Sequence, residues 1–169
     1  MVLISSLIGT TLYAGKYNTS TKSFIGLEVG AATVDGDRSN GFKHQGSAVE
    51  YGVKLGAQSD EWRATFSLDY FNSTTDDQTV QKGLGMIDYF FFTSDSEMNI
   101  RPFIGANVGY GRYESTLVDA TGLVYGGQAG VVVGVRDNID IDLSYRYTLF
   151  QSTAVNSSGN IVFGLNYIY

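Results

Sequence analysis

The chain has 169 residues, including 21 Gly, 12 Tyr, 10 Phe, one Trp, one Pro, one His and no Cys. This length suits a single domain with a substantial core, and the lack of Cys excludes disulfides, thiolate catalysis, cysteine zinc sites and a lipid-anchored cysteine. The chain has 17 acidic and 11 basic residues and a net charge of -6, which argues against a nucleic-acid partner.

Residues 1–14 are a candidate signal peptide. The apolar run VLISSLI is followed by small residues up to Ala14, which is typical of the core and cleavage site of such a peptide. A positively charged start is missing, since the first basic residue is Lys16, so an ordinary N-terminal strand or tail remains the alternative. The run is too short for a membrane helix. We therefore expect a signal peptide at 1–14, a periplasmic lead-in at 15–22 and one domain at 23–169.

The rest of the chain alternates apolar and polar residues with a period of two, as β-strands do. In the first strand, for example, Leu27 and Val29 lie on one face and Glu28 on the other. Strands are expected at 25–32, 49–58, 62–70, about 79–91, 103–110, 125–136, 139–147 and 160–169, with nine or ten residues each on average. The fourth can be read in either facing, and keeping Asp88 off the apolar face puts Ile87, Tyr89 and Phe91 on it. No segment shows a helical period with caps, so almost no helix is expected.

Long and short connections alternate along the chain. The links at 33–47, 72–78, 114–122 and 151–159 are long and polar, those at 59–61 and 137–138 are tight, and that at 93–99 is intermediate. Transmembrane barrels place long extracellular loops at one rim and short periplasmic turns at the other. The sequence therefore predicts an eight-stranded antiparallel up-and-down transmembrane β-barrel of the all-β class.

The two faces of the strands distinguish a membrane barrel from a soluble one, whose apolar face would line the interior. The apolar face carries the bulky side chains, whereas the polar face is mostly Gly, Ser, Thr and Asn with scattered charges. Because an eight-stranded interior is narrow, many rings there would overpack it. We therefore expect the apolar face to contact lipid. The expected lipid-facing residues are Leu27, Val29, Val53, Leu55, Phe66, Leu68, Ile104, Val108, Val131, Val133, Ile141, Leu143, Phe163 and Leu165.

The charges of the polar face are balanced, which suits a closed interior where an unpaired charge costs several kcal/mol. Six acidic residues, Glu28, Glu50, Asp69, Asp88, Asp140 and Asp142, accompany six basic ones, Lys54, Arg63, Lys82, Arg101, Arg136 and Arg146. The glycines Gly83, Gly85, Gly105, Gly109 and Gly111 lack the strand-to-helix context of a nucleotide loop and are expected inside the barrel.

Aromatic residues near strand ends are expected to form two interfacial girdles. Trp62 and Tyr70 share one face eight residues apart, roughly 20 Å along the membrane normal for a tilted strand. The alternative is that Tyr simply favours strands. The expected girdle residues are Trp62, Tyr70 and Tyr110, with Tyr145 and Tyr147 in the outer girdle and Tyr167 and Tyr169 in the periplasmic one.

Three segments carry a family resemblance. The last strand, IVFGLNYIY, resembles the C-terminal signal that presents outer-membrane barrels to their assembly machinery, and RPFIGANVGYG and DNIDIDLSYRY are similar to late strands of small porin-like barrels of the OmpX, OmpA-transmembrane and opacity type. The resemblance covers about residues 23–169. It implies a Gram-negative outer-membrane location with both termini in the periplasm. Since no domain follows the last strand, a role in anchoring the cell wall is not expected.

The expected function is a structural or surface-interaction role without catalysis or cofactor. Its expected partners are outer-membrane lipid, lipopolysaccharide, the barrel-assembly machinery and a host or surface ligand at the loops. The loops contain Asp35, Asp37, Asp76, Asp77, Glu114 and Asp119 together with Arg38, Lys43 and His44. Asp35, Asp37, Ser39 and Asn40 approach calcium-loop spacing, but Asn40 stands where the pattern requires Gly, and Gly46 stands where it requires the bidentate acid. Two alternatives remain: a small porin-like channel, and a lipid A-modifying enzyme that would use His44 with Ser47 and either Ser73 or Asp76.

Overall fold

The computed structural model describes residues 21–36, 45–73, 78–91, 99–115, 119–151 and 155–169. They form eight strands: β1 (Lys22–Gly36), β2 (Gln45–Gln58), β3 (Trp62–Ser73), β4 (Gln78–Phe90), β5 (Ile100–Ser115), β6 (Asp119–Arg136), β7 (Ile139–Phe150) and β8 (Val155–Ile168). No helix long and apolar enough to cross a membrane occurs in these ranges. The all-β prediction is confirmed.

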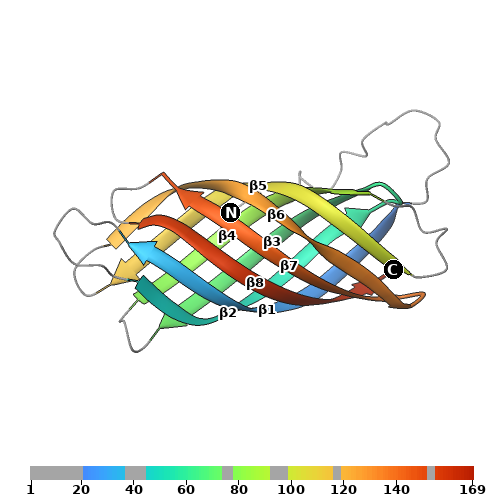
Figure 1. The fold of residues 1–169 in the computed structure, drawn as a ribbon, viewed down its shortest axis with the longest axis horizontal. Helices are drawn as coiled ribbons and strands as arrows, with labels where there is room; N and C mark the ends of the chain where they lie inside the picture. The colour runs from blue at the N-terminus through green and yellow to red at the C-terminus, as the bar shows by residue number, and fades with distance from the viewer. Residues whose placement is uncertain (1–20, 37–44, 74–77, 92–98, 116–118, 152–154) are drawn as a thin grey trace, which may run out of the picture.

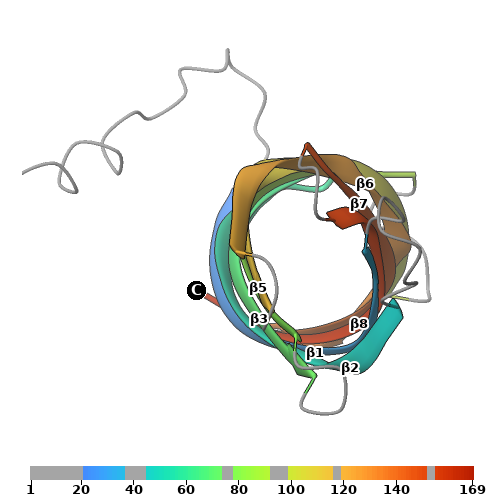
Figure 2. The same cartoon turned by 90° about the vertical axis from the view of Figure 1, so that its left-hand side faces the viewer.

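The strands close into a single barrel (Figures 1 and 2). Each pairs antiparallel with its neighbours in sequence, and β8 pairs back onto β1. At this seam Tyr169 N donates to Ser23 O at 2.9 Å, and Ser23 N donates to Tyr169 O at 3.2 Å. Following paired residues once around the barrel from Phe24 leads back to β1 at Val34, ten positions along the strand. This stagger accompanies the strand tilt that closure of a barrel requires.

The two rims of the barrel differ. At the turn end, β1 begins, β8 finishes, and tight connections join Gln58 to Trp62 and Arg136 to Ile139. There Ser59 N donates to Trp62 O at 2.7 Å. At the opposite rim, the loop end, β1, β3, β5 and β7 finish, on the left in Figure 1. The predicted short turns at 59–61 and 137–138 are therefore confirmed.

The strands are 12 to 18 residues long, so the predicted average of nine or ten was too short, although β4 has the length expected for it. The extra residues lie mostly at the loop end, where β1 reaches Gly36 and β8 already begins at Val155. The sequence prediction ended each strand where the apolar alternation stopped. Backbone pairing continues beyond that point because the hydrogen bonds of the ladder do not require apolar side chains.

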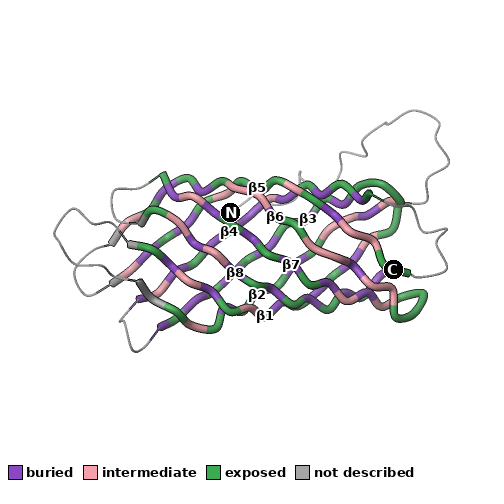
Figure 3. Tube along the Cα trace, in the orientation of Figure 1, coloured by how far each residue is buried: buried purple, intermediate pink, exposed green. Residues whose placement is uncertain are grey.

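Exposure alternates along the strands, as Figure 3 shows by colour. In β3 every second residue from Trp62 is exposed and the others are buried. In β4, Asp88 is buried while Ile87 and Tyr89 are exposed, as is Phe91 directly after the strand, in agreement with the facing chosen from the sequence. The core of the protein is therefore the interior of the barrel.

Candidate functional site

The outer wall of the barrel is apolar. Large exposed side chains come from all eight strands, with Leu27 63% and Phe66 46% exposed. All the residues predicted to face lipid lie on this wall: Leu27, Val29, Val53, Leu55, Phe66, Leu68, Ile104, Val108, Leu143, Phe163 and Leu165 are exposed, and Val131, Val133 and Ile141 are half-buried. A monomeric soluble protein rarely exposes so extensive an apolar surface.

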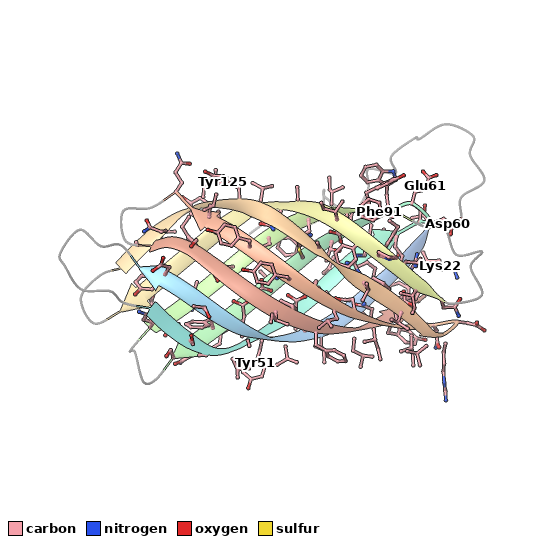
Figure 4. The ribbon with its side chains drawn as sticks, viewed as in Figure 1. Lys22, Tyr51, Asp60, Glu61, Phe91 and Tyr125 are labelled. Carbon is pink, nitrogen blue, oxygen red and sulfur yellow. The ribbon has the colours of Figure 1, made fainter. Side chains whose placement is uncertain are left out.

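Aromatic side chains gather toward both rims of this wall. At the turn end the ring centroids of Trp62 and Tyr89 are 4.9 Å apart, and those of Tyr89 and Phe91 are 6.0 Å apart. Figure 4 shows Phe91 at this end, and Tyr51 and Tyr125 nearer the other. The predicted girdle residues Trp62, Tyr70, Tyr110, Tyr145, Tyr147, Tyr167 and Tyr169 are all exposed.

The backbone of Tyr145 lies farther from the loop end than that of its neighbour Tyr147 on the outer face of β7. Its pairing partner on β8 is Ile161. Its hydroxyl nevertheless reaches the backbone of Gly159, where an added Cβ would lie only 2.7 Å from the phenol oxygen. Because Gly159 is one outward position nearer the loop end, the glycine lets the ring extend along the wall toward that rim.

Charged side chains fill the middle of the lumen, and Arg146 is at their centre. Its Nη1 donates to Glu28 Oε1 and to Asp69 Oδ2, both at 3.0 Å, and its Nη2 donates to Glu28 Oε2 at 3.3 Å. All three residues are buried. The planar guanidinium serves two carboxylates from two other strands, which a lysine ammonium would do with less directional geometry.

A second group of ion pairs continues from Glu28 toward the turn end. Lys54 Nζ lies 2.7 Å from Asp142 Oδ2 and 3.6 Å from Glu28 Oε2. Arg63 Nε donates to Asp88 Oδ2 at 2.9 Å, and its Nη1 lies 3.7 Å from Asp142 Oδ2. These pairs join β1, β2, β3, β4 and β7 through side chains, so the charges hold opposite walls of the barrel together.

On the loop side of Arg146, Lys82 Nζ lies 2.7 Å from Glu50 Oε2. Glu50 also accepts from Asn160 Nδ2 at 2.5 Å. All three side chains are buried, so this pair is removed from water like the others.

Arginine and phenylalanine side chains close the lumen at the turn end. The guanidinium of Arg101 lies 4.4 Å from the ring centroid of Phe90, and that of Arg63 lies 4.6 Å from the centroid of Phe103. Arg101 Nη2 also lies 3.3 Å from Asp140 Oδ2. Guanidiniums at these distances over ring faces gain cation–π attraction, which is stronger away from water.

An apolar cluster fills the loop half of the lumen, and its member Met86 reaches the cavity that Arg63 and Arg146 line. Its members are all buried: Ala32, Val34, Phe71, Val80, Leu84, Met86, Tyr113, Val124 and Phe150. The ion pairs in the middle of the lumen therefore lie between two layers that contain aromatic rings.

The rings inside the lumen correct the expectation that its residues would be mostly small. Phe24, Phe71, Phe90, Phe103, Tyr113 and Phe150 are buried there. Glycines make the room: an added Cβ at Gly111 would lie 2.9 Å from the ring of Phe150, and one at Gly56 would lie 2.8 Å from the ring of Phe24. Many more rings would still overpack so narrow an interior. Individual rings fit where the facing strand has a glycine, which leaves the space of a side chain free.

Little free space remains beside the charge network of the lumen. A cavity beside the charge network, lined by Arg146, Lys54 and Phe103 among others, has a volume of about 10 Å³, space for about one water molecule. The described side chains therefore leave little room for an aqueous channel.

Three residues predicted from the sequence to lie inside the barrel lie outside it. Arg136, counted among the interior charges, is exposed, because a register shift between Gly134 and Arg136 interrupts the alternation near the end of β6. Gly83 and Gly85 lie on the outer wall, since they pair with the exposed residues Leu68 and Phe66. The other charges predicted for the interior, Glu28, Glu50, Lys54, Arg63, Asp69, Lys82, Asp88, Asp140, Asp142 and Arg146, are buried there, with Arg101 half-buried.

Solved structures share this architecture. The chain superposes on Neisserial surface protein A with a TM-score of 0.73, over 87% of this chain and 97% of that one, at 19% identity. For outer membrane protein H of P. aeruginosa the TM-score is 0.62 over 88% and 99% of the two chains, at 20% identity. The chain has the fold of the small outer-membrane β-barrels. Ail, the attachment invasion locus protein of Yersinia pestis, is also similar, with a TM-score of 0.53 over 88% and 98%, at 18% identity. No protein-family model and no curated protein matches the sequence.

In this small-barrel fold, the two serines considered for a catalytic group come from neighbouring strands but face opposite sides of the wall. Ser47 is exposed on the outer wall, with its Oγ 3.3 Å from Thr33 Oγ1, whereas Ser73 is buried. The described residues hold no group of three or more Asp, Glu or His arranged for a metal ion.

Several predictions concern parts of the chain outside the described residues. These are the signal peptide at 1–14, the loop residues Asp37, Arg38, Asn40, Lys43, His44, Asp76 and Asp77, and the side chain of Asp119.

Proposed function

We propose that this protein is a structural or surface-interaction protein of the outer membrane of a Gram-negative bacterium. The observation that carries the proposal is the reversal of burial: ion-paired charges such as Arg146 and Glu28 are inside, while Leu27, Phe66 and Leu143 are outside. In water this wall would cost roughly 25 cal/mol for each Å² of apolar surface. Contact with lipid removes that cost, and the likeness to small outer-membrane barrels supports the same location.

The two aromatic girdles set the height of the barrel in the membrane. The exposed residues between Trp62 at the turn end and Tyr70 toward the loop end are apolar on this face of β3. Their expected separation of roughly 20 Å approaches the apolar band of about 25 Å in transmembrane barrels. By the usual arrangement of such barrels, we propose that the turn end is periplasmic and the loop end extracellular.

The filled lumen supports a role outside the barrel rather than through it. The ion pairs are held between the cluster that contains Phe71 and Phe150 and the layer that contains Phe90 and Phe103. We therefore propose that the protein acts through its lipid-facing wall and its loops, with outer-membrane lipid, lipopolysaccharide and a surface or host ligand as partners. The C-terminal strand would present the chain to the barrel-assembly machinery. We propose no catalytic step.

The mobility of the detergent-extracted protein on an SDS gel, with and without boiling, tests the membrane barrel. A closed barrel keeps its ion pairs and backbone ladder in SDS until heated, so the unboiled protein should migrate differently from the boiled one. Fractionation of the cell envelope should recover the protein with the outer membrane. A protein that stays monodisperse in buffer without detergent would contradict the proposal.

Single-channel recording in planar bilayers tests the filled lumen. We expect no steady nanosiemens steps, because the cavity of about 10 Å³ beside the ion pairs holds about one water. Such steps would favour the alternative of a small porin-like channel. The absence of catalysis is tested by His44→Ala: a loss of lipid A modification in vesicles would identify an enzyme instead.

A further inference from the structure

The outer wall has a groove where β3, β4, β5 and β6 run side by side. Its volume is about 430 Å³, within the range of roughly 300–1,000 Å³ that small-molecule sites occupy. Its exposed walls come from Leu68 and Tyr70 on β3 and from Tyr110 on β5, and Gly83 of β4 forms the floor between them. The floor continues toward the turn end at Gly85, which pairs with Phe66 and Val108.

Packing does not require glycine at these two positions. An added Cβ at Gly83 would meet only Leu68 Cδ2 at 3.5 Å, and one at Gly85 would meet Val108 O at 3.6 Å, both ordinary contacts. Glycines of the lumen differ: a Cβ at Gly164 would lie 2.7 Å from the carboxylate of Asp142. The groove is therefore open because side chains are missing from its floor, and not because neighbouring atoms already fill that space.

The groove is amphipathic along the barrel axis. Its loop end carries Gln81, Arg112 and Thr121, which form one paired row across β4, β5 and β6, and all three are exposed. The Arg112 side chain is 52% exposed and pairs with Glu114, with 2.6 Å between Nη2 and Oε1. A guanidinium has five N–H donors and binds phosphate with fork geometry. Below this row the floor and walls are apolar, except for the tyrosine hydroxyls.

We propose that this groove binds one phosphorylated, acylated glycolipid of the outer leaflet, which deepens the proposed membrane function and rests on it. The acyl chain lies over Gly83 and Gly85 between the side chains of β3 and β5. The phosphate meets Arg112, and Gln81 and Thr121 hydrogen-bond the sugar. The order of these groups matches that of such a lipid, whose charged and sugar groups face outward and whose chains point to the bilayer centre. A glycolipid fits better than a simple phospholipid because an amide and a hydroxyl flank the cation.

The test is native mass spectrometry of the detergent-solubilised barrel, titrated with bis-phosphorylated hexa-acyl lipid A. Arg112→Gln removes the cation, and Arg136→Gln is its control at the exposed turn end. Gly83→Leu fills the floor, and Gly127→Leu is its control on β6, where an added Cβ would meet only Gly105 O at 3.4 Å. Each variant is first shown to be folded by the shift on heating in an SDS gel.

We expect Arg112→Gln and Gly83→Leu each to weaken binding about tenfold, and both controls to bind within twofold of the unchanged protein. The unchanged protein should bind dephosphorylated lipid A about tenfold more weakly than bis-phosphorylated lipid A, a comparison that needs no variant. The Arg112→Gln protein should bind the two lipids equally well. Equal binding of both lipids to the unchanged protein, or controls as weak as the variants, would overturn the site while leaving the heat shift and the membrane proposal intact. Equally tight binding of phosphatidylglycerol would overturn the glycolipid assignment.

Discussion

Replacing Arg146 by Met should destabilise the folded barrel strongly. Three charge-assisted hydrogen bonds, at 3.0, 3.0 and 3.3 Å, would be lost, and the carboxylates of Glu28 and Asp69 would remain buried. Lys54, 3.6 Å from Glu28, and Lys82, the paired neighbour of Asp69, would compensate these charges only in part, because each lies 2.7 Å from another carboxylate, Asp142 and Glu50 respectively. Breaking a buried ion pair by removing one partner costs about 3–5 kcal/mol, and we expect a loss of that size in the free energy of unfolding.

Urea unfolding of the barrel in lipid vesicles measures this loss. Trp62 is the only tryptophan of the chain and is exposed on the outer wall, so its emission reports transfer between lipid and water. Combining Arg146→Met with Glu28→Gln and Asp69→Asn should recover most of the stability, because no unpaired charge would remain. A loss below about 1 kcal/mol in the single variant would refute the reasoning, and so would a triple variant less stable than the single one.

Three other substitutions test the lumen and the wall by the same assay. Leu143→Arg, on the outer wall, should cost about 2–4 kcal/mol if it lies near the bilayer midplane, while Leu143→Phe should change little; equal effects would argue against lipid contact. Gly164→Ala should cost about 1–3 kcal/mol from overpacking, since its Cβ would lie 2.7 Å from a buried carboxylate, whereas Gly83→Ala should be nearly neutral; similar losses would contradict the assignment of the two faces. Arg63→Gln should destabilise by about 3 kcal/mol or more, but the exposed Arg136→Gln by less than about 0.5 kcal/mol. Equal losses in these two would place Arg136 inside after all.

The alternation of residues was enough to predict the strands and their facing, because one face of a barrel strand is buried throughout. A single residue decided the ambiguous case: Asp88 is 1% exposed and bonds Arg63, so keeping the charge off the apolar face was sufficient. The rule failed at Arg136, where the register shift after Gly134 reverses the facing. The alternation was not applied to Gly83 and Gly85. Since they are alternate residues with Ile87 in the same strand, they lie on the outer face as Ile87 does.

The pairing of the interior charges could not be predicted from the sequence. Arg146 on β7 meets Glu28 on β1 and Asp69 on β3 across the lumen, and such contacts depend on the stagger accumulated around the whole barrel. The groove over Gly83 was missed for a related reason. Its row of Gln81, Arg112 and Thr121 comes from three strands, and only the register brings these residues together.

The seam between β1 and β8 limits the order in which this protein can form. Every other pair of neighbouring strands is also consecutive in the chain, so hairpins can assemble as the polypeptide emerges. The hydrogen bonds between Ser23 and Tyr169 require the first and the last strand of the barrel at the same time. Before these bonds form, β1 and β8 expose unpaired N–H and C=O groups, which promote aggregation. Because the seam brings the two ends of the barrel sequence together, a circular permutant that joins them and opens the chain at 59–61 should keep the same ring of neighbours.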